Sequence, residues 1–207
     1  MGRLLLVRHG ETAWNAEGRL QGSEDISLSE EGRRQARLIG DRLADRSIDV
    51  AFSSDQSRAR ETAQHILEGR DVVLNPIPEL RERSHGVFEG LTVRERKDQY
   101  PEMFAASLVK NLDFAPDGGE TFRATNLRMA GWAHDFLQKH LKETVLVVGH
   151  GGSLRGAIIA WMGFPDESTW RFMLANCGLS IIDTYADNAV LRLFNDISHL
   201  GGLEPES

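Results

Sequence analysis

The sequence predicts an α/β protein, a three-layer α/β/α sandwich with a mainly parallel central sheet and a C-terminal hairpin at one edge. Short apolar runs alternate with longer segments of helical periodicity, which is typical of parallel strands connected by helices on both faces of a sheet. A length of 207 residues fits one such unit better than two. We therefore expect a single domain over residues 1–200 and a flexible tail over residues 201–207.

Four apolar runs supply the expected parallel strands, at residues 4–7, 48–53, 72–74 and 145–148. The first run, LLLV, and the last, VLVV, are apolar at every position, as strands buried on both faces must be. Near the C-terminal end, LSIIDTYAD and AVLRLFND predict two strands joined by a turn at Asp187 and Asn188. This pair is the expected edge hairpin.

Helices are expected at residues 29–45, 56–67, 121–141 and 153–162. In the first of them, Ala36, Ile39 and Leu43 lie on one face at helical spacing, and charged residues occupy the other positions. Segment 111–120 contains PDGG and is expected to be a loop.

The composition limits the classes of function. A formal net charge of -7 argues against nucleic acid or an anionic membrane as a general partner, because both require a basic face. Cys177 is the only cysteine, which excludes an intramolecular disulfide and fits a reducing compartment. Arg8 and His9 interrupt the first apolar run, and no stretch is long enough to span a bilayer. We expect a cytoplasmic protein with neither nucleic acid nor membrane as a partner.

Both of the most apolar strands run directly into His-Gly, as LLLVRHG and as VLVVGHGG. In parallel α/β sheets, ligands bind just beyond the carboxyl ends of the strands. If the two strands are neighbours, His9 and His150 face one crevice. The glycines that follow, Gly10, Gly151 and Gly152, let the backbone pass close to a bound group.

Two arginines are expected at the same edge. The run VAFSS leads into DQSRARE, where Ser54 or Asp55 can cap a helix whose first turn contains Arg58. Arg8 directly precedes His9. Guanidinium groups and helix N-termini both match phosphate oxygens, so the pattern predicts a phosphate site in an otherwise acidic protein.

A histidine can attack phosphorus when the leaving oxygen is protonated by a neighbouring acid. The segment ELRERSHGVFEG offers two candidates for that acid, Glu82 and Glu89. The residues alone choose neither between these carboxylates nor between the two histidines. A phosphate-binding module without turnover is the alternative from a different class, and the intact set of His9, Arg58, His150 and Glu82 argues against it.

Two histidines and a carboxylate could instead hold a metal ion. We consider this reading weaker, because Arg8 and Arg58 would repel a divalent cation and the sequence has no HxH or HxxxH spacing. GxGxxG and GxxxxGK[ST] motifs are also absent, which disfavours nucleotide binding. We therefore expect no metal and no cofactor.

The motifs RHGETAWN, RLQG, LSEEGRRQA, SSDQSRARETA, LRERSHGVFEG and VVGHGGSLR follow one another in this order. This set resembles the histidine phosphatase superfamily, also called the phosphoglycerate mutase-like family, over about residues 3–180. The resemblance implies a three-layer α/β/α fold and metal-free catalysis through a phosphohistidine intermediate.

The resemblance also implies individual roles. His9 would be the nucleophile, and Glu82, rather than Glu89, would be the proton donor. The transferring phosphoryl group would be held by Arg8, Arg58 and His150, with Asn15, Gln21 and Gly151 as further phosphate and substrate contacts.

Within this family the sequence resembles the phosphatase branch. Cofactor-dependent phosphoglycerate mutases carry a long, proline-rich insert before the second histidine corner, whereas this chain has a short connection containing PDGGET, similar to the P-x-G-E-S segment of phosphatases. The expected function is hydrolysis of small phosphorylated metabolites. The alternatives are a cofactor-dependent phosphoglycerate mutase and a narrow phosphatase such as an α-ribazole phosphatase.

Two groups of aromatic residues carry weaker expectations. The segment between residues 87 and 116 contains an apolar set, namely Phe88, Tyr100, Met103, Phe104 and Phe114. Part of this set is expected to cover the site and contact the leaving group. The alternative, favoured for most of these residues, is that they pack against the small helices of the same segment. An exposed patch of Trp161, Phe164 and Trp170 is expected to mark a homodimer contact or to close the core.

Overall fold

The computed structural model describes residues 1–201, which contain a six-stranded sheet in the order β3-β2-β4-β1-β5-β6. β1, β2, β3 and β4 are mutually parallel, and β5 and β6 extend the sheet as an antiparallel hairpin beside β1. The predicted fold class and edge hairpin are therefore confirmed. Of the predicted tail, residues 202–207 lie outside the described part of the chain. The strands are β1 (Gly2–Arg8), β2 (Val50–Ser54), β3 (Leu74–Ile77), β4 (Thr144–Gly149), β5 (Leu179–Thr184) and β6 (Ala189–Asp196).

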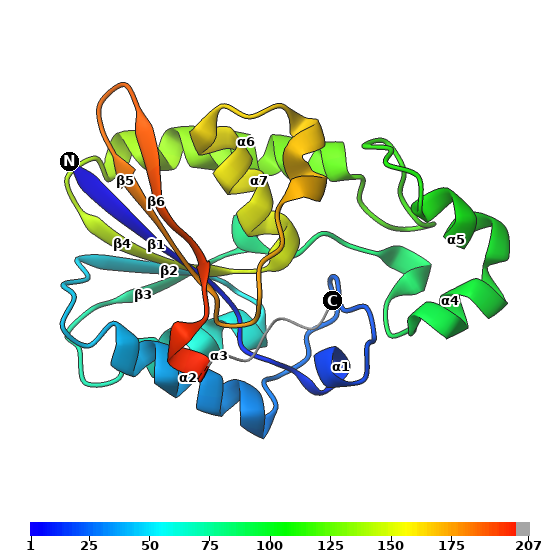
Figure 1. Ribbon diagram of the computed structural model, residues 1–207, viewed down its shortest axis with the longest axis horizontal. Coiled ribbons are helices and arrows are strands. Elements are labelled where there is room, and N and C mark those ends of the chain that lie inside the picture. The colour runs from blue at the N-terminus through cyan, green and yellow to red at the C-terminus, as the bar shows by residue number, and fades with distance from the viewer. Residues whose placement is uncertain (202–207) are drawn as a thin grey trace.

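Helices cover both faces of the sheet. In Figure 1, α2 and α3 lie on one side of the strands and α6 and α7 on the other, while α4 and α5 project as a separate lobe beyond the sheet. The helices are α1 (Ala13–Ala16), α2 (Glu30–Arg42), α3 (Ser57–Ile66), α4 (Val93–Gln99), α5 (Pro101–Ser107), α6 (Phe122–Lys139) and α7 (Gly151–Met162). Over residues 1–201, no helix combines the length and the apolar character needed to cross a membrane.

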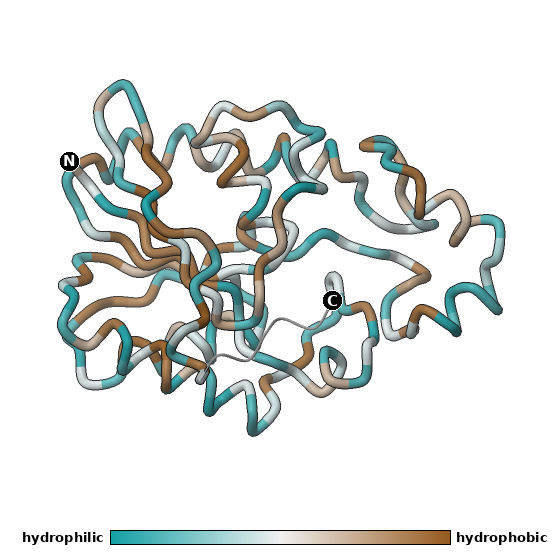
Figure 2. Tube along the Cα trace, in the orientation of Figure 1, coloured by the Kyte–Doolittle hydropathy of each residue, from teal (hydrophilic) through white to brown (hydrophobic). Residues whose placement is uncertain are grey.

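The middle of strand β1, Leu4–Val7, shows why this run is apolar at every position. Leu5 and Val7 pack into the cluster formed with α2 and α3, whereas Leu4 and Leu6 pack into the cluster formed with α6 and α7. Each of the four is at most 1% exposed. Because successive side chains point to opposite faces, a strand between two helical layers must be apolar throughout. Figure 2 accordingly shows the most hydrophobic chain along the central strands.

The third strand differs from the prediction. The run at residues 72–74 was expected to be the strand, but β3 spans Leu74–Ile77 and includes Pro76. Proline donates no backbone hydrogen bond and is tolerated on an edge strand. Among the described strands β3 pairs with β2 alone, so it occupies such an edge.

Two helix starts also differ from the prediction. The N-cap of α3 is Gln56 rather than Ser54 or Asp55, because β2 continues through Ser54 and the Ser54 hydroxyl accepts from the Gln56 N–H. Helix α7 begins at Gly151 with His150 as its N-cap, two residues earlier than expected. Gly151 and Gly152 therefore belong to the first turn of the helix.

The aromatic residues of the α4–α5 lobe pack within it. The Phe88 and Tyr100 ring centroids lie 5.9 Å apart, and the Arg96 guanidinium lies over Phe88 and Phe104 at 5.8 and 5.9 Å. This arrangement matches the packing alternative for these three rings.

The expected exposure of Trp161 is wrong. Its ring is partly buried against the α6 and α7 core cluster, and its indole N–H donates to the Ala133 carbonyl at 3.2 Å. Phe164 is 43% exposed, with its ring stacked 5.8 Å from Phe172. Trp170 packs edge-on against Phe122. Formation of a homodimer stays a prediction.

Candidate active site

The two His-Gly corners lie side by side. Strands β1 and β4 are neighbours in parallel register, with Arg8 opposite Gly149, so His9 and His150 follow at the same level of the sheet. Their ring centroids are 5.1 Å apart, and the rings are 3% and 0% exposed. The structure therefore brings the two predicted histidines together at the carboxyl edge of the sheet.

The neighbours of the two rings fix opposite tautomers. His9 Nδ1 lies 2.7 Å from the Gly10 carbonyl oxygen, which can only accept, so Nδ1 carries the hydrogen and the neutral ring keeps a lone pair on Nε2. His150 Nδ1 accepts from the Arg58 Nε–H at 3.2 Å, so in His150 the hydrogen lies on Nε2. That N–H has no hydrogen-bond partner within residues 1–201.

Burial keeps both rings neutral. It lowers the pKa of His9 well below its usual value, and the charges of Arg58 and Arg8 lower it further. The pKa of His150 is also lowered by burial and then by Arg58 and His9. One ring thus offers a bare nitrogen and the other an N–H donor.

Arg58 lies beneath the histidines and is completely buried. Its guanidinium donates to the carbonyls of Gly22 and Glu24 at 2.8 and 2.7 Å, in addition to His150. Burial lowers the pKa of Arg58 to about 10, which leaves the group cationic at neutral pH. The second helix predicted from the sequence, which is α3 in the structure, therefore delivers its arginine to the site.

Gln56 is a site residue that the sequence did not reveal. Its Oε1 accepts from Arg58 at 3.2 Å and from the backbone N–H of Glu82 at 3.1 Å. Its Nε2 donates to the carbonyls of Gly22 and Ser23 at 3.2 and 3.0 Å. One amide thus joins three segments, and the only available signal was a polar residue two positions before Arg58.

Arg8 is held by the segment that precedes β5. Its Nη1 donates to the Leu174 carbonyl, and its buried Nε has no partner in the described part of the chain. The Cys177 N–H bonds the carbonyls of Arg8 and His9 at 3.0 and 3.3 Å. Asn176 Nδ2 donates to the His9 carbonyl at 2.9 Å. This strap, residues 174–177, fixes the first His-Gly corner and was not foreseen.

Asn15 and Gln21 border the same corner. The Asn15 Oδ1 accepts from the Thr12 N–H at 3.1 Å and from Asn176 Nδ2 at 3.4 Å, so its Nδ2 turns away from both and remains a donor. Gln21 is 7% exposed, and its Oε1 has no partner among residues 1–201. Each side chain keeps a polar group available for a ligand.

Glu82 lies at the N-terminus of α7. Its carboxylate accepts from the Gly152 N–H at 3.0 and 3.1 Å and from the Arg83 N–H at 2.7 Å. Burial acts to raise the pKa of Glu82, but these two N–H donors outweigh it and leave the pKa below its usual value. A Cβ at Gly151 would lie 3.8 Å from Glu82 Oε2 and 3.9 Å from Arg8 Nε, so Gly151 lies between these groups.

Glu89, the other candidate acid, has a different position. Its carboxylate accepts from the backbone N–H groups of Ser23, Glu24 and His85, at 2.9, 3.2 and 2.7 Å. It therefore ties the loop that receives Arg58 to the segment after Glu82. This saturation by local donors distinguishes Glu89 from Glu82, which faces the crevice.

The collected groups form a cluster of cationic and N–H donor groups suited to phosphate. Arg8, Arg58 and the His150 N–H converge near the bare nitrogen of His9, with a carboxylate opposite them. Within residues 1–201, no three His, Cys, Asp or Glu side chains gather where they could hold a metal ion. The arrangement can bind a phosphoryl group, attack it and protonate a leaving oxygen.

Comparison with known proteins agrees with this geometry. Residues 4–197 match the family model of the histidine phosphatase superfamily (branch 1). Phosphoserine phosphatase 1 of Hydrogenobacter thermophilus is 32% identical over 97% of this chain and 95% of its own length. The 2,3-bisphosphoglycerate-dependent phosphoglycerate mutase of Bartonella henselae is 33% identical over 91% of this chain and 94% of its own.

A solved structure extends the comparison to the fold. The α-ribazole phosphatase from Shigella flexneri superposes with a TM-score of 0.88 at 31% identity, covering 94% of this chain and 96% of that one. The family expected from the sequence motifs is therefore confirmed: the chain belongs to the histidine phosphatase superfamily, branch 1.

Proposed function

We propose that the protein hydrolyses small phosphate monoesters through a phosphohistidine formed on His9. The observation that carries the proposal is the pair of opposite tautomers. The Gly10 carbonyl leaves His9 with a bare Nε2, and the Arg58 guanidinium leaves His150 with an N–H that no group of residues 1–201 accepts. A nucleophile and a donor to phosphate are both required for transfer to an imidazole.

In the first step, His9 Nε2 attacks phosphorus, an N–P bond forms and the P–O bond to the alcohol breaks. Negative charge spreads over the equatorial oxygens of the transferring group. Arg8, Arg58 and the His150 Nε2–H are the proposed groups that meet this charge, with Asn15 Nδ2 as a further donor. Because these groups are already held by the protein, they need no reorganisation during the reaction.

Glu82 is the proposed proton donor to the departing alcohol. In the second step, the same carboxylate takes a proton from water, whose oxygen attacks the phosphohistidine and releases His9 and inorganic phosphate. The low pKa of Glu82 means that the free enzyme holds this group ionised. The negative charge of a bound phosphate group raises the pKa of a nearby carboxyl, so Glu82 can take over the proton that a monoanionic substrate brings.

Phosphoserine is the first substrate to test, because the Hydrogenobacter relative is named a phosphoserine phosphatase. An α-ribazole phosphate is the second, because the Shigella neighbour is named an α-ribazole phosphatase. Phosphoglycerate mutase activity is the alternative, because the Bartonella relative carries that name. Conversion of 3-phosphoglycerate into its 2-isomer, with little release of phosphate, would favour the mutase over the hydrolase.

The deciding experiment traps the intermediate. Purified protein is mixed with radiolabelled phosphoserine or 4-nitrophenyl phosphate in EDTA, quenched in alkali and digested. We expect an acid-labile label on the peptide that contains His9, and loss of both label and turnover in His9→Ala. Turnover without a label on this peptide, or activity abolished by EDTA, would contradict the proposal.

We also propose a cytoplasmic location and a small phosphorylated substrate, with no nucleic acid, membrane, metal or cofactor as a partner. The lone Cys177 is buried and unpaired, which fits a reducing compartment. Cell fractionation with an antibody against the protein tests the location.

A further inference from the structure

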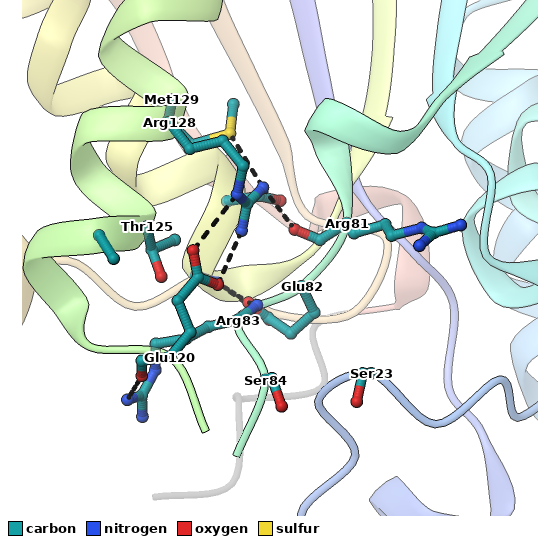
Figure 3. Close-up of polar contacts among 12 residues, drawn as sticks. Ser23, Arg81, Glu82, Arg83, Ser84, Glu120, Thr125, Arg128 and Met129 are labelled. Carbon is teal, nitrogen blue, oxygen red and sulfur yellow. Dashed lines mark hydrogen bonds and ion pairs between the residues drawn. The ribbon is translucent and has the colours of Figure 1, made fainter. Parts of the chain in front are cut away.

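The segment that carries Glu82 is enclosed by a second layer of contacts from the PDGGE loop, residues 116–120, and from helix α6. In the sequence, this loop indicated only a resemblance to the phosphatase branch. Figure 3 shows Arg128 reaching from α6 toward Glu120 and the backbone beside Glu82. Neither Glu120 nor Arg128 is among the residues proposed to contact the phosphate.

The loop docks directly onto the residues that follow Glu82. The Glu120 N–H donates to the Ser84 carbonyl at 2.9 Å, and the Val87 N–H donates to the Asp117 carbonyl at 3.0 Å. Gly86 has a φ of +51°, and a Cβ there would lie 2.0 Å from the Asp117 oxygen. The two segments thus approach too closely for any side chain at position 86.

Arg128 closes this arrangement. It forms an ion pair with the Glu120 carboxylate at 3.0 Å, and its Nη1 donates to the carbonyls of Glu79 and Arg81 at 2.5 and 3.0 Å. Both side chains are about one quarter exposed, at 26% and 24%. One guanidinium therefore fixes the backbone just before Glu82 and the loop that holds the backbone just after it (Figure 3).

Arg83 connects Glu120 directly to the Glu82 carboxylate. Its Nη1 donates to the Glu120 carbonyl at 2.9 Å, and its guanidinium lies 3.9 Å from the centre of the Phe122 ring. The backbone N–H of this same residue donates to Glu82 Oε1 at 2.7 Å. The position of Glu120 is thus linked to that of the Glu82 carboxylate through a single residue.

We propose that Glu120 and Arg128 are positioning residues for Glu82, and that their ion pair sets where the proton donor meets the leaving oxygen. The inference rests on the proposed hydrolase function. An acid is effective only within hydrogen-bond reach of the oxygen that it protonates. A displacement of about 1 Å can cost a large factor in rate.

The leaving group supplies a readout that a merely structural role would not move. Phosphoserine releases an alkoxide that needs a proton, whereas 4-nitrophenyl phosphate releases a stable phenolate that needs little help. Because Glu82 also activates water in the second step, which both substrates share, the comparison uses kcat/KM, which reports the first step. We expect Arg128→Gln and Glu120→Gln to lower kcat/KM for phosphoserine by about tenfold or more, within the range of general acid catalysis. We expect kcat/KM for 4-nitrophenyl phosphate to fall less than about threefold in either variant, because the phosphate cradle is unchanged.

Arg123 provides a matched control on the same helix. It pairs with Asp113 at 2.6 Å through two N–H donors, and within residues 1–201 no hydrogen bond or ion pair joins either side chain to segment 79–84. Arg123→Gln is expected to leave the ratio of the two kcat/KM values at the wild-type level. Glu82→Gln sets the upper limit of the ratio, and adding Arg128→Gln to it is expected to cause little further loss.

The outcomes separate cleanly. Equal losses on both substrates in Arg128→Gln and Glu120→Gln, or a wild-type ratio in both, would overturn the positioning role while leaving the hydrolase proposal intact. Absence of phosphohistidine and turnover in the wild-type protein would instead contradict the proposed function. If Arg128→Gln does not fold, Arg128→Lys carries the test, because lysine keeps the charge but lacks the planar fork that bridges Glu120 and two carbonyls.

Discussion

The first turn of α7 lets us predict the effect of an alanine at Gly152 on folding and on activity. An alanine Cβ there would lie 2.2 Å from Glu82 Oε1, well inside contact distance. The atom that it meets is the end of a flexible side chain, so the carboxylate swings away and the fold is retained. We therefore expect Gly152→Ala to remain folded and to lose at most about 1.5–3 kcal/mol of unfolding free energy, the value of one hydrogen bond to a charged group.

The loss of activity follows from the contacts that Glu82 gives up. Its carboxylate receives the Gly152 N–H on both oxygens, and a hydrogen bond to a charged group is worth about 1.5–3 kcal/mol. Because the Gly152 N–H helps to keep the pKa of Glu82 low, loss of this donor raises that pKa. The displaced acid also no longer meets the leaving oxygen, so kcat for phosphoserine should fall at least about a hundredfold.

The assay compares kcat for phosphoserine with kcat for 4-nitrophenyl phosphate, alongside urea unfolding. Gly131→Ala is the matched control, because Gly131 lies in α6 and a Cβ there meets nothing within 4 Å. That control should be as active as the wild type and up to about 1 kcal/mol more stable, since alanine favours a helix interior. Wild-type hydrolysis of phosphoserine by Gly152→Ala would refute the assignment of Glu82.

Two further predictions concern the same rim. In Glu89→Gln, an amide nitrogen would face backbone N–H donors that bond the carboxylate in the wild type. The free energy of unfolding should therefore drop by about 1–3 kcal/mol in urea melts, and KM should rise. An unchanged KM would argue against a link between the contacts of Glu89 and the phosphate site. For pH, the lowered pKa keeps Glu82 ionised in the free enzyme, so the proton must arrive with the monoanionic substrate, whose second pKa is about 6. kcat/KM for phosphoserine should therefore fall as the pH rises above about 6, and a flat profile up to about pH 9 would be inconsistent with this route.

Much of the fold was predictable because it depends on local patterns. Runs such as LLLV and VLVV are apolar at every position, and a strand covered on both faces must be so. The third strand was misplaced because Pro76 ordinarily ends a strand, and only its place at the edge of the sheet permits it.

The chemistry of the histidines could not be predicted from spacing. Both follow a buried strand and precede glycine, so the local sequences are equivalent. The distinction comes from what each Nδ1 meets, a carbonyl of the next residue for His9 and a guanidinium from a distant helix for His150. Only the fold places the Arg58 Nε–H against the Nδ1 of His150.

Supporting residues were missed for the same reason. Asn176 lies in an ordinary loop sequence, and its contact with His9 exists because β5 pairs with β1. Arg128 resembles any charged residue of an amphipathic helix until the turn that it faces is known to contain Glu82.

The place of β1 in the sheet has a consequence for the newly made protein. This strand lies between β4 and β5, whose residues are synthesised much later, at 144–149 and 179–184. While the ribosome is still translating the middle of the message, the LLLV run has neither ladder partner and exposes its backbone and apolar side chains. Until translation is complete, the nascent chain therefore needs a chaperone to cover this strand or must be finished quickly. A transcript truncated before codon 179 would yield an inactive product that is prone to aggregate.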